Sequence, residues 1–473
     1  PPALSDSLDG ESTRTVIERV RQCWRSIRRA DEPLVVVTHE TPIRIVTGLV
    51  DGARSRPERR SPSTTHAVRS NPDRGGTNSQ QTVEQVTCNR ITIYLEQPNT
   101  YYVMAQATAS LRSVDDLDII VDADGHTLEG LDEILPYVDN EAIVKQIERT
   151  DMPYADIFTY THTGSIIGEA YGRGGQTLIN DADEANQKQR DLDDFDIDYS
   201  ITTPTLHLMI HTVNNDRVAV ALSKAYNDWV ADNMLEHSDQ FRACLVVPPQ
   251  DPQRAAEEIE RRGADPKVTG VYMPPGSWTP LGNRYFDPVY EAAEKHDLTI
   301  ICHGLQMREG GFPVQAEGAQ TFAESHVVSL PWAVMWGMTS IMFEGVPARF
   351  PDLDFVFQEA GIGWVPWMRW RMDDHYLEYT DDVPDLEKLP SEYIDDSFYF
   401  TTQPIGDPRG KNSHIADIIR MAGPENIMYS ADLPHMDFDP PGEVFDQIAA
   451  HLEEDEVRAI MGETAADLFD LPY

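Results

Sequence analysis

Short apolar segments alternate with helical patterns from residue 117 to the C-terminus, and this alternation restricts the fold more than any other feature. Eight segments have the length and the branched or aromatic residues typical of buried strands. They are 117–123, 196–206, 242–248, 268–273, 298–303, 353–358, 397–402 and 426–431, with helical patterns such as 217–236, 252–262, 287–296, 331–344 and 443–453 between them. Strands that alternate with helices pair in parallel, so the sequence predicts an α/β fold, a closed (β/α)8 barrel of the TIM type.

The barrel region is longer than the ~250 residues typical of such a fold, which predicts insertions. A polar stretch rich in Gly and Asp, roughly 140–195, follows the first predicted strand. Long loops after barrel strands often cover active sites, and we expect this insertion to do so.

The first hundred residues differ in charge from the rest of the chain. Residues 1–103 contain 14 Lys and Arg against 12 Asp and Glu, whereas residues 104–473 contain 24 against 68. Residues 51–82 are rich in Arg, Ser, Pro and Gly without an apolar period, which is typical of a linker. We therefore expect a partial segment at 1–50, a linker of low order at 51–103 and a barrel domain at 104–473, the first two parts being a truncated or fused upstream piece.

The segment at 1–50 has a helical pattern at 10–30 and an apolar strand at 34–39. Its motifs "GES" (10–12) and "VVVTHETPIRIV" (35–46) resemble the C-terminal part of a histidine phosphatase domain over residues 8–50. The resemblance implies a partial α/β phosphatase-like segment in which His39 is the second active-site histidine. The phosphate-accepting histidine of that family lies in an Arg-His-Gly motif, which this sequence lacks. We expect no phosphatase activity, and a phosphatase remains the alternative that a colorimetric assay tests.

The chain is strongly acidic, with 38 Lys and Arg against 80 Asp and Glu and a formal charge of −42. Such a surface repels nucleic-acid phosphates, so we expect no nucleic-acid partner. Dense carboxylates with few lysines are typical of proteins that work in molar salt, because salt screens their repulsion. The composition predicts a halophilic source, with an ordinary acidic enzyme as the alternative.

The longest apolar stretch, around 331–343, is too short and too interrupted to cross a bilayer, so we expect no membrane partner. The four cysteines are scattered and form no Cys-x-x-Cys motif, which favours a reducing compartment. We expect a cytoplasmic protein.

Residues that bind metals lie at the C-terminal ends of predicted strands, where barrel enzymes have their active sites. Asp124 and His126 end the first strand on one face, His303 ends the fifth and Asp432 ends the eighth. Taken singly, each residue is more often structural than metal-binding: an Asp at a strand end commonly caps a turn, and a His on an apolar strand commonly belongs to the core. Together they form a mixed nitrogen and oxygen set that suits one divalent ion, Zn²⁺ or Mn²⁺.

Residues 117–473 resemble the amidohydrolase-related family of the amidohydrolase superfamily, in the branch of aminocarboxymuconate-semialdehyde and resorcylate decarboxylases. The resemblance depends on "DADGH" (122–126), "ICHG" (301–304), "FEGVPARFPDLDFVFQEAGIGWVPWMRWRMD" (343–373), "YSADLPHMD" (429–437) and "IMGETAADLFDL" (460–471). It implies a barrel with one divalent metal held by Asp124, His126, His303 and Asp432, and a homodimer. No lysine ends the fourth strand to form a bridging carbamate, which favours a single metal.

The acidic residue at position 124 favours a non-oxidative decarboxylase of a small carboxylic acid, as in resorcylate-type enzymes. A metal-dependent hydrolase of a C–N, ester or lactone bond is the alternative, and a metal-binding homologue without turnover is the second. In either enzyme Asp432 is expected to move the proton. Relatives often carry a catalytic His where this chain has Glu359, so Glu359 is a candidate for proton transfer, together with His435.

Three further residues are candidates for substrate binding: His207, His326 and Arg371. His207 follows the second strand, His326 lies past the fifth, and Arg371 belongs to the helix after the sixth. A core role is the alternative for each histidine. An ion pair on the helix surface is the alternative for Arg371.

Overall fold

The computed structural model describes four short strands within residues 34–105, and then residues 111–150, 184–304 and 322–473 except 276, 278, 384 and 436. The chain divides into two compact units, 1–110 and 111–473. The predicted helix at 10–30, His39, the linker at 51–82 and residues 151–183 of the predicted insertion lie outside the described residues.

The first unit contains a four-stranded antiparallel sheet. Its strands are β1 (Leu34–Thr38), β2 (Glu84–Cys88), β3 (Ile91–Gln97) and β4 (Thr100–Ala105), in the order β1-β4-β3-β2. Leu34 pairs with Ala105, and β3 pairs with both β2 and β4. Three of these strands fall in or next to the stretch that composition predicts to be of low order, because Val, Ile, Thr and Tyr favour strands.

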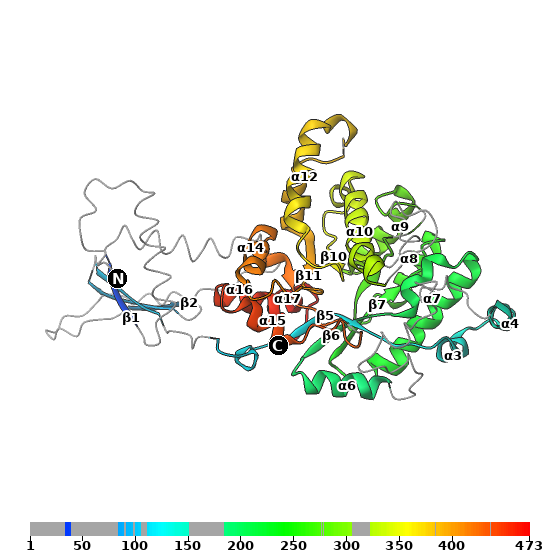
Figure 1. The fold of residues 1–473 in the computed structure, drawn as a ribbon, viewed down its shortest axis with the longest axis horizontal. Helices are drawn as coiled ribbons and strands as arrows, with labels where there is room; N and C mark the ends of the chain where they lie inside the picture. The colour runs from blue at the N-terminus through cyan, green and yellow to red at the C-terminus, as the bar shows by residue number, and fades with distance from the viewer. Residues whose placement is uncertain are drawn as a thin grey trace, which may run out of the picture. The chain divides into compact units, whose positions relative to one another are not determined.

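The second unit is built on eight parallel strands that form a barrel (Figure 1). The strands are β5 (Val121–His126), β6 (Tyr199–Thr203), β7 (Phe241–Val246), β8 (Val268–Tyr272), β9 (Thr299–His303), β10 (Phe355–Gln358), β11 (Phe398–Thr401) and β12 (Ile427–Met428), paired in sequence order. Ala123 N donates to Tyr429 O and His126 N to Leu433 O, which brings the first strand against the last. The predicted (β/α)8 barrel is confirmed.

Helices connect the strands and pack outside them (Figure 1). They are α3 (Leu131–Ile134), α4 (Glu141–Thr150), α6 (Glu184–Asp194), α7 (Asp216–Val230), α8 (Pro252–Arg262), α9 (Asp287–Lys295), α10 (Phe322–Phe343), α11 (Val346–Arg349), α12 (Val365–Glu378), α13 (Pro390–Ser397), α14 (Ser413–Ala422), α15 (Pro441–Ile448), α16 (Glu454–Arg458) and α17 (Thr464–Leu468). Caps fix several of their starts. Asn215 accepts hydrogen bonds from the first-turn amides of α7, and Asp251 does so for α8.

Helix α10 is long and apolar enough, over His326–Phe343, to cross a bilayer by length and composition alone. Half of that window is buried in the protein, and the helix packs against β9 and β10. The buried side chains of Met338, Ile341 and Met342 account for its apolar character as a helix of the barrel.

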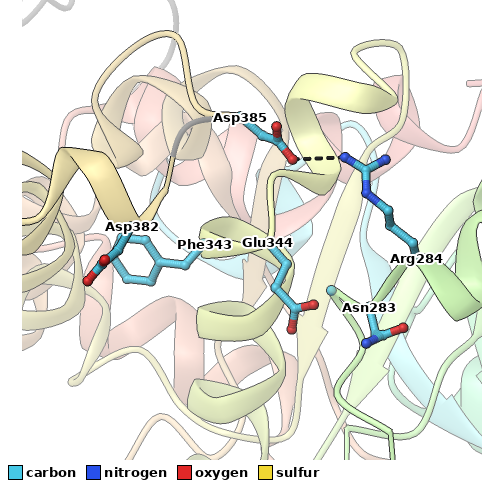
Figure 2. A pocket seen from close by; sticks show the side chains of 7 residues that line it. Asn283, Arg284, Phe343, Glu344, Asp382 and Asp385 are labelled. Carbon is cyan, nitrogen blue, oxygen red and sulfur yellow. Dashed lines mark hydrogen bonds and ion pairs between the residues drawn. The ribbon is translucent and has the colours of Figure 1, made fainter.

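A pocket of about 350 Å³ opens where α10 ends, lined by Gly282, Asn283, Arg284, Phe343, Glu344, Asp382 and Asp385 (Figure 2). Arg284 Nη2 donates to Asp385 Oδ2 over 2.9 Å across it. None of the residues predicted to bind metal or substrate lines this pocket.

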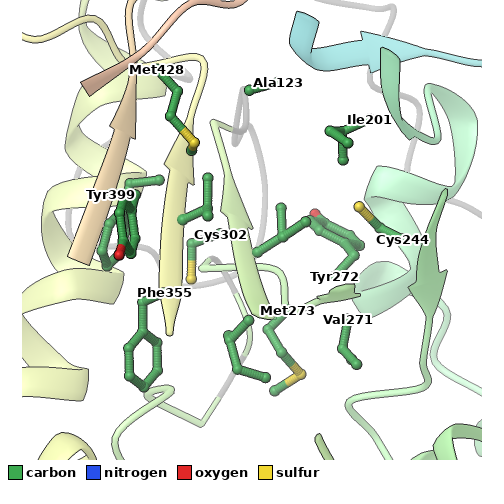
Figure 3. Packing of buried hydrophobic residues seen from close by; sticks show 14 of the residues in the cluster. Ala123, Ile201, Cys244, Val271, Tyr272, Met273, Cys302, Phe355, Tyr399 and Met428 are labelled. Atoms are coloured by element: carbon green, nitrogen blue, oxygen red, sulfur yellow. The ribbon is translucent and has the colours of Figure 1, made fainter. Parts of the chain in front are cut away.

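Aromatic side chains on neighbouring strands pack the core (Figure 3). The rings of Phe355 and Phe398 lie 5.0 Å apart, and Phe357 stacks on both Phe398 and Phe400 at 5.5 Å. Burial of these rings holds the strands in register and so fixes the edge at which the polar residues emerge.

Candidate active site

Polar side chains converge at the C-terminal edge of the barrel. Asp124 and His126 belong to the end of β5, and His303 ends β9. Glu359 directly follows β10, and Asp432 lies beyond β12. All five are buried. Parallel strands bring their carboxyl ends to one edge, which explains how residues so distant in sequence meet.

The two histidines of β5 and β9 approach each other most closely through their Nε2 atoms, which are 3.1 Å apart. Asp124 Oδ1 lies 3.6 Å from His126 Nε2 and 3.5 Å from His303 Nε2. Asp432 Oδ1 lies 3.2 Å from His126 Nε2. Two ligands bound at about 2.1 Å to one ion lie roughly 3.0 to 3.4 Å apart, so these separations fit a shared ion closely.

Backbone carbonyls fix the tautomers of both rings. His126 Nδ1 lies 3.0 Å from Pro204 O, and His303 Nδ1 lies 2.6 Å from Gly304 O. A carbonyl only accepts, so each Nδ1 carries the proton and each Nε2 presents a lone pair. Two lone pairs face each other across 3.1 Å, an arrangement that a cation between them stabilises.

Asp124 supplies a further sign of a cation. Its Oδ1 accepts from Thr203 Oγ1, but its Oδ2 is buried without a hydrogen-bond partner among the described residues. A buried carboxylate oxygen is ordinarily paired or bound to metal. The residues present therefore fit one divalent ion held by Asp124, His126, His303 and Asp432.

Asp432 belongs to a hydrogen-bonded chain that includes the predicted His435 and two residues that the sequence did not single out, Thr205 and Gln403. Its Oδ1 lies 2.7 Å from His435 Nδ1, and His435 Nε2 lies 3.0 Å from Thr205 Oγ1. Gln403 Nε2 donates to Asp432 Oδ2 over 3.1 Å. Asp432 also has a positive φ of 59°, which costs backbone energy and is common at functional sites. This chain can hold and pass a proton.

Glu359 lies on the other side of His303, with Oε2 3.2 Å from His303 Nε2. Its φ is +50°, so two of the site's carboxylates occur on left-handed backbone. Its amide donates to Thr401 Oγ1 over 3.3 Å, and Gly304 fits beneath its carbonyl, where a Cβ would come within 2.4 Å.

Burial shifts the pKa values of the site in opposite directions. Loss of hydration raises the pKa of the Asp124, Glu359 and Asp432 carboxyls well above their usual range, and neighbouring carboxylates raise them further. Loss of hydration also lowers the pKa of His303 to about 3 and of His435 to about 4. The histidines are therefore neutral at pH 7 and cannot balance the carboxylates.

The three predicted substrate-binding residues have different positions. His207 is buried, with Nδ1 3.0 Å from Glu129 Oε1 and its ring against Tyr226. His326 is partly exposed beside Asp437, with Nε2 3.6 Å from Asp437 Oδ2. Arg371 is exposed on α12 over the Trp367 ring, so its placement fits the helix-surface alternative.

The sequence interpretation did not single out Glu129, Thr205, Gln403 or Asp437. Glu129 accepts hydrogen bonds from the amides of Thr205 and His207, which holds the loop after β6 at the site. Of these four residues, only Asp437 lies in a motif that pointed to the site, since it is the last residue of "YSADLPHMD" (429–437).

Comparison with known proteins gives a family match and relatives at low identity. The sequence model of the family described as amidohydrolase matches residues 169–471, a span that includes His303 and Asp432 and begins after His126. Gamma-resorcylate decarboxylase of Rhodococcus jostii is 26% identical over 278 residues, 54% of this chain and 78% of the relative. The protein of that name from Rhizobium sp. is 24% identical over 252 residues, 50% of this chain and 72% of the relative.

Solved structures share the barrel fold. 2,6-Dihydroxybenzoate decarboxylase from Rhizobium superposes with a TM-score of 0.53 at 17% identity, covering 75% of this chain and 99% of that chain. 5-Carboxyvanillate decarboxylase from Novosphingobium aromaticivorans, complexed with manganese and 4-hydroxy-3-methoxy-5-nitrobenzoic acid, superposes with a TM-score of 0.55 at 17% identity, covering 77% and 100%.

Proposed function

Because the chain belongs to the amidohydrolase family, we propose that it is a metal-dependent decarboxylase of a hydroxylated benzoic acid. The observation that carries the proposal is the pair of Nε2 lone pairs facing each other at 3.1 Å beside Asp124. The substrate class is taken from the relatives named as decarboxylases of resorcylate, dihydroxybenzoate and carboxyvanillate.

A divalent ion held by Asp124, His126, His303 and Asp432 supplies Lewis acidity toward the substrate oxygens when it is bound. The protein's own residues supply the proton. In the reaction the bond from the ring carbon to the carboxylate breaks, its electron pair stays on the ring carbon, CO₂ leaves and a C–H bond forms. Asp432 is the group that delivers this proton, because its carboxyl lies at the site and is hydrogen-bonded to His435 over 2.7 Å, which gives it a partner for proton exchange.

His435 relays a proton from water back to Asp432: its Nε2 takes up a proton as its Nδ1 gives one to the carboxylate, so the ring stays neutral overall. One proton fits between Asp432 Oδ1 and His435 Nδ1 at 2.7 Å, and Thr205 Oγ1 orients the other ring nitrogen at 3.0 Å. Gln403 holds the second carboxylate oxygen, so the carboxyl cannot rotate freely. The arrangement keeps one proton at a fixed position beside the reacting carbon.

The test is turnover of 2,6-dihydroxybenzoate by the full chain loaded with Mn²⁺, followed as CO₂ release and formation of the arene. In D₂O the product is expected to carry one deuterium at the carbon that lost the carboxylate. Asp432→Asn is expected to abolish this, whereas Asp446→Asn, an exposed carboxylate on α15, leaves it unchanged. Hydrolysis of amide, ester or lactone substrates without CO₂ release would replace this proposal by the hydrolase.

We further propose that the protein works as a homodimer in the cytoplasm of a halophile. The acidic composition supports high salt, since carboxylates keep a protein hydrated there. Cys244 and Cys302 are buried free thiols, which suits a reducing compartment. Light scattering in molar KCl tests the dimer.

A further inference from the structure

A second group of possible ligands adjoins the first. His326 of α10, Glu359 after β10 and Asp437 after β12 each offer one ligand atom, and the three atoms lie within 4.8 Å of one another. His326 Nε2 is 3.6 Å from Asp437 Oδ2. Glu359 also reaches the first group, since its Oε2 is 3.2 Å from His303 Nε2. Glu359 therefore lies between the two groups.

The two carboxylates of this group need a positive partner. The Glu359 side chain is only 10% exposed, and the atom it faces, His303 Nε2, presents a lone pair and cannot donate. Asp437 Oδ2 is buried and accepts no hydrogen bond from the described part of the chain. Buried carboxylates without donors or cations are costly, so both oxygens favour a bound cation.

The charge balance points the same way. Asp124, Asp432, Glu359 and Asp437 are four carboxyl groups that belong to adjoining groups of possible metal ligands at the same end of the barrel. Lys188, a nearby ammonium, acts on both Asp122 and Asp124, so its single charge offsets only one of these five carboxylates. One divalent ion balances two of the four carboxylates. A second divalent ion balances the remaining two and allows an anionic substrate to approach.

We propose that His326, Glu359 and Asp437 bind a second divalent cation, with Glu359 bridging it to the first. The inference rests on the proposed function in taking the first cation as present. One imidazole and two carboxylates suit Zn²⁺ or Mn²⁺. The His326 and Asp437 side chains are 19% and 22% exposed, so water or a substrate oxygen can complete the coordination.

Metal content and electron paramagnetic resonance of the Mn²⁺-loaded, desalted full chain test this inference. We expect about two Mn²⁺ per chain, coupled magnetically because ions that share a bridge lie about 3.5 to 4 Å apart. His326→Gln and Asp437→Asn should each reduce the content to about one and convert the coupled spectrum to that of an isolated ion. His451→Gln, an exposed histidine, is the matched control and should keep both ions.

The outcomes separate this inference from the proposed function. One ion per chain in the wild type, lost in His303→Ala but kept in Asp437→Asn, overturns the second site and leaves the first. Two ions per chain in both His326→Gln and Asp437→Asn also overturn the second site. Two coupled ions with no decarboxylation of any hydroxybenzoate support the second site and contradict the proposed function. Circular dichroism shows whether each variant is folded. If Asp437→Asn does not fold, the metal content of His326→Gln decides whether the second site exists.

Discussion

Inside the buried site, His435 Nδ1 lies 2.7 Å from Asp432 Oδ1. His435 follows Asp432 by three residues in the sequence. The loop after β12 turns back on itself here, because Asp432 has a positive φ of 59° and the His435 amide donates to the Asp432 carbonyl over 2.8 Å. The pair can therefore share one proton.

His435→Asn keeps a side-chain donor near Asp432 but cannot transfer a proton. We expect kcat to fall by about 10²-fold or more, the range of general acid–base contributions, with metal content unchanged. Steady-state kinetics over pH, with metal analysis of the same samples, measures this. His414→Asn on the exposed side of α14 is the control. An unchanged kcat in His435→Asn would remove His435 from the proton path.

His303→Ala removes one of the two facing lone pairs and one metal ligand. We expect loss of the first ion and of the thermal stabilisation that added Mn²⁺ gives the wild type, because a ligand that binds only the folded state stabilises it. Melting curves with and without Mn²⁺ measure the effect, and His451→Ala is the control. Equal Mn²⁺ stabilisation in wild type and His303→Ala would show that the ion binds elsewhere.

Gly304→Ala places a Cβ 2.4 Å from Glu359 O. The backbone of Glu359 has to move, so we expect destabilisation of about 1–3 kcal/mol and a loss of activity larger than stability explains. Urea unfolding and kinetics below the transition measure both. Gly442→Ala, which meets nothing within 4 Å, should be neutral. Full activity in Gly304→Ala would mean that Glu359 needs no fixed position.

His211, which lies outside the active site, is expected to make the stability of the protein depend on pH. Burial lowers its pKa from 6.5 to about 4, so the unfolded chain binds a proton between these values that the folded chain does not. Stability is therefore lost as pH falls from about 6.5 to about 4, by about 3 kcal/mol for this group. His211→Gln should lose less stability than the wild type when urea unfolding is compared at pH 7 and pH 4.5. Identical losses would contradict the shift.

Salt dependence tests the halophilic assignment. With 80 acidic against 38 basic residues, we expect the melting temperature to fall markedly between about 2 M and about 0.1 M KCl, since repulsion becomes less screened. Mutual repulsion is long-ranged, so no single ion pair should account for the effect. A melting temperature independent of KCl would indicate an ordinary acidic enzyme.

The sequence determined the barrel and the edge at which its chemistry lies. Strands appear within a few residues of their predicted positions, as β10 at Phe355–Gln358 against 353–358 shows. Alternation along β5 predicted that Asp124 and His126 share a face, and their side chains lie 3.6 Å apart. Local periodicity encodes both features, because strand formation and side-chain direction depend on neighbouring residues.

Only the tertiary structure decided which side chains meet across the barrel. Thr205 and His435 are 230 positions apart, and no local pattern predicts their contact. Arg371 shares a quoted motif with Glu359, yet helix geometry leaves it exposed while Glu359 is buried beside His303. The sequence therefore determines which polar side chains lie at the end of each strand. Packing decides which of those groups share a proton or an ion, because that depends on loop conformation and side-chain burial over long separations.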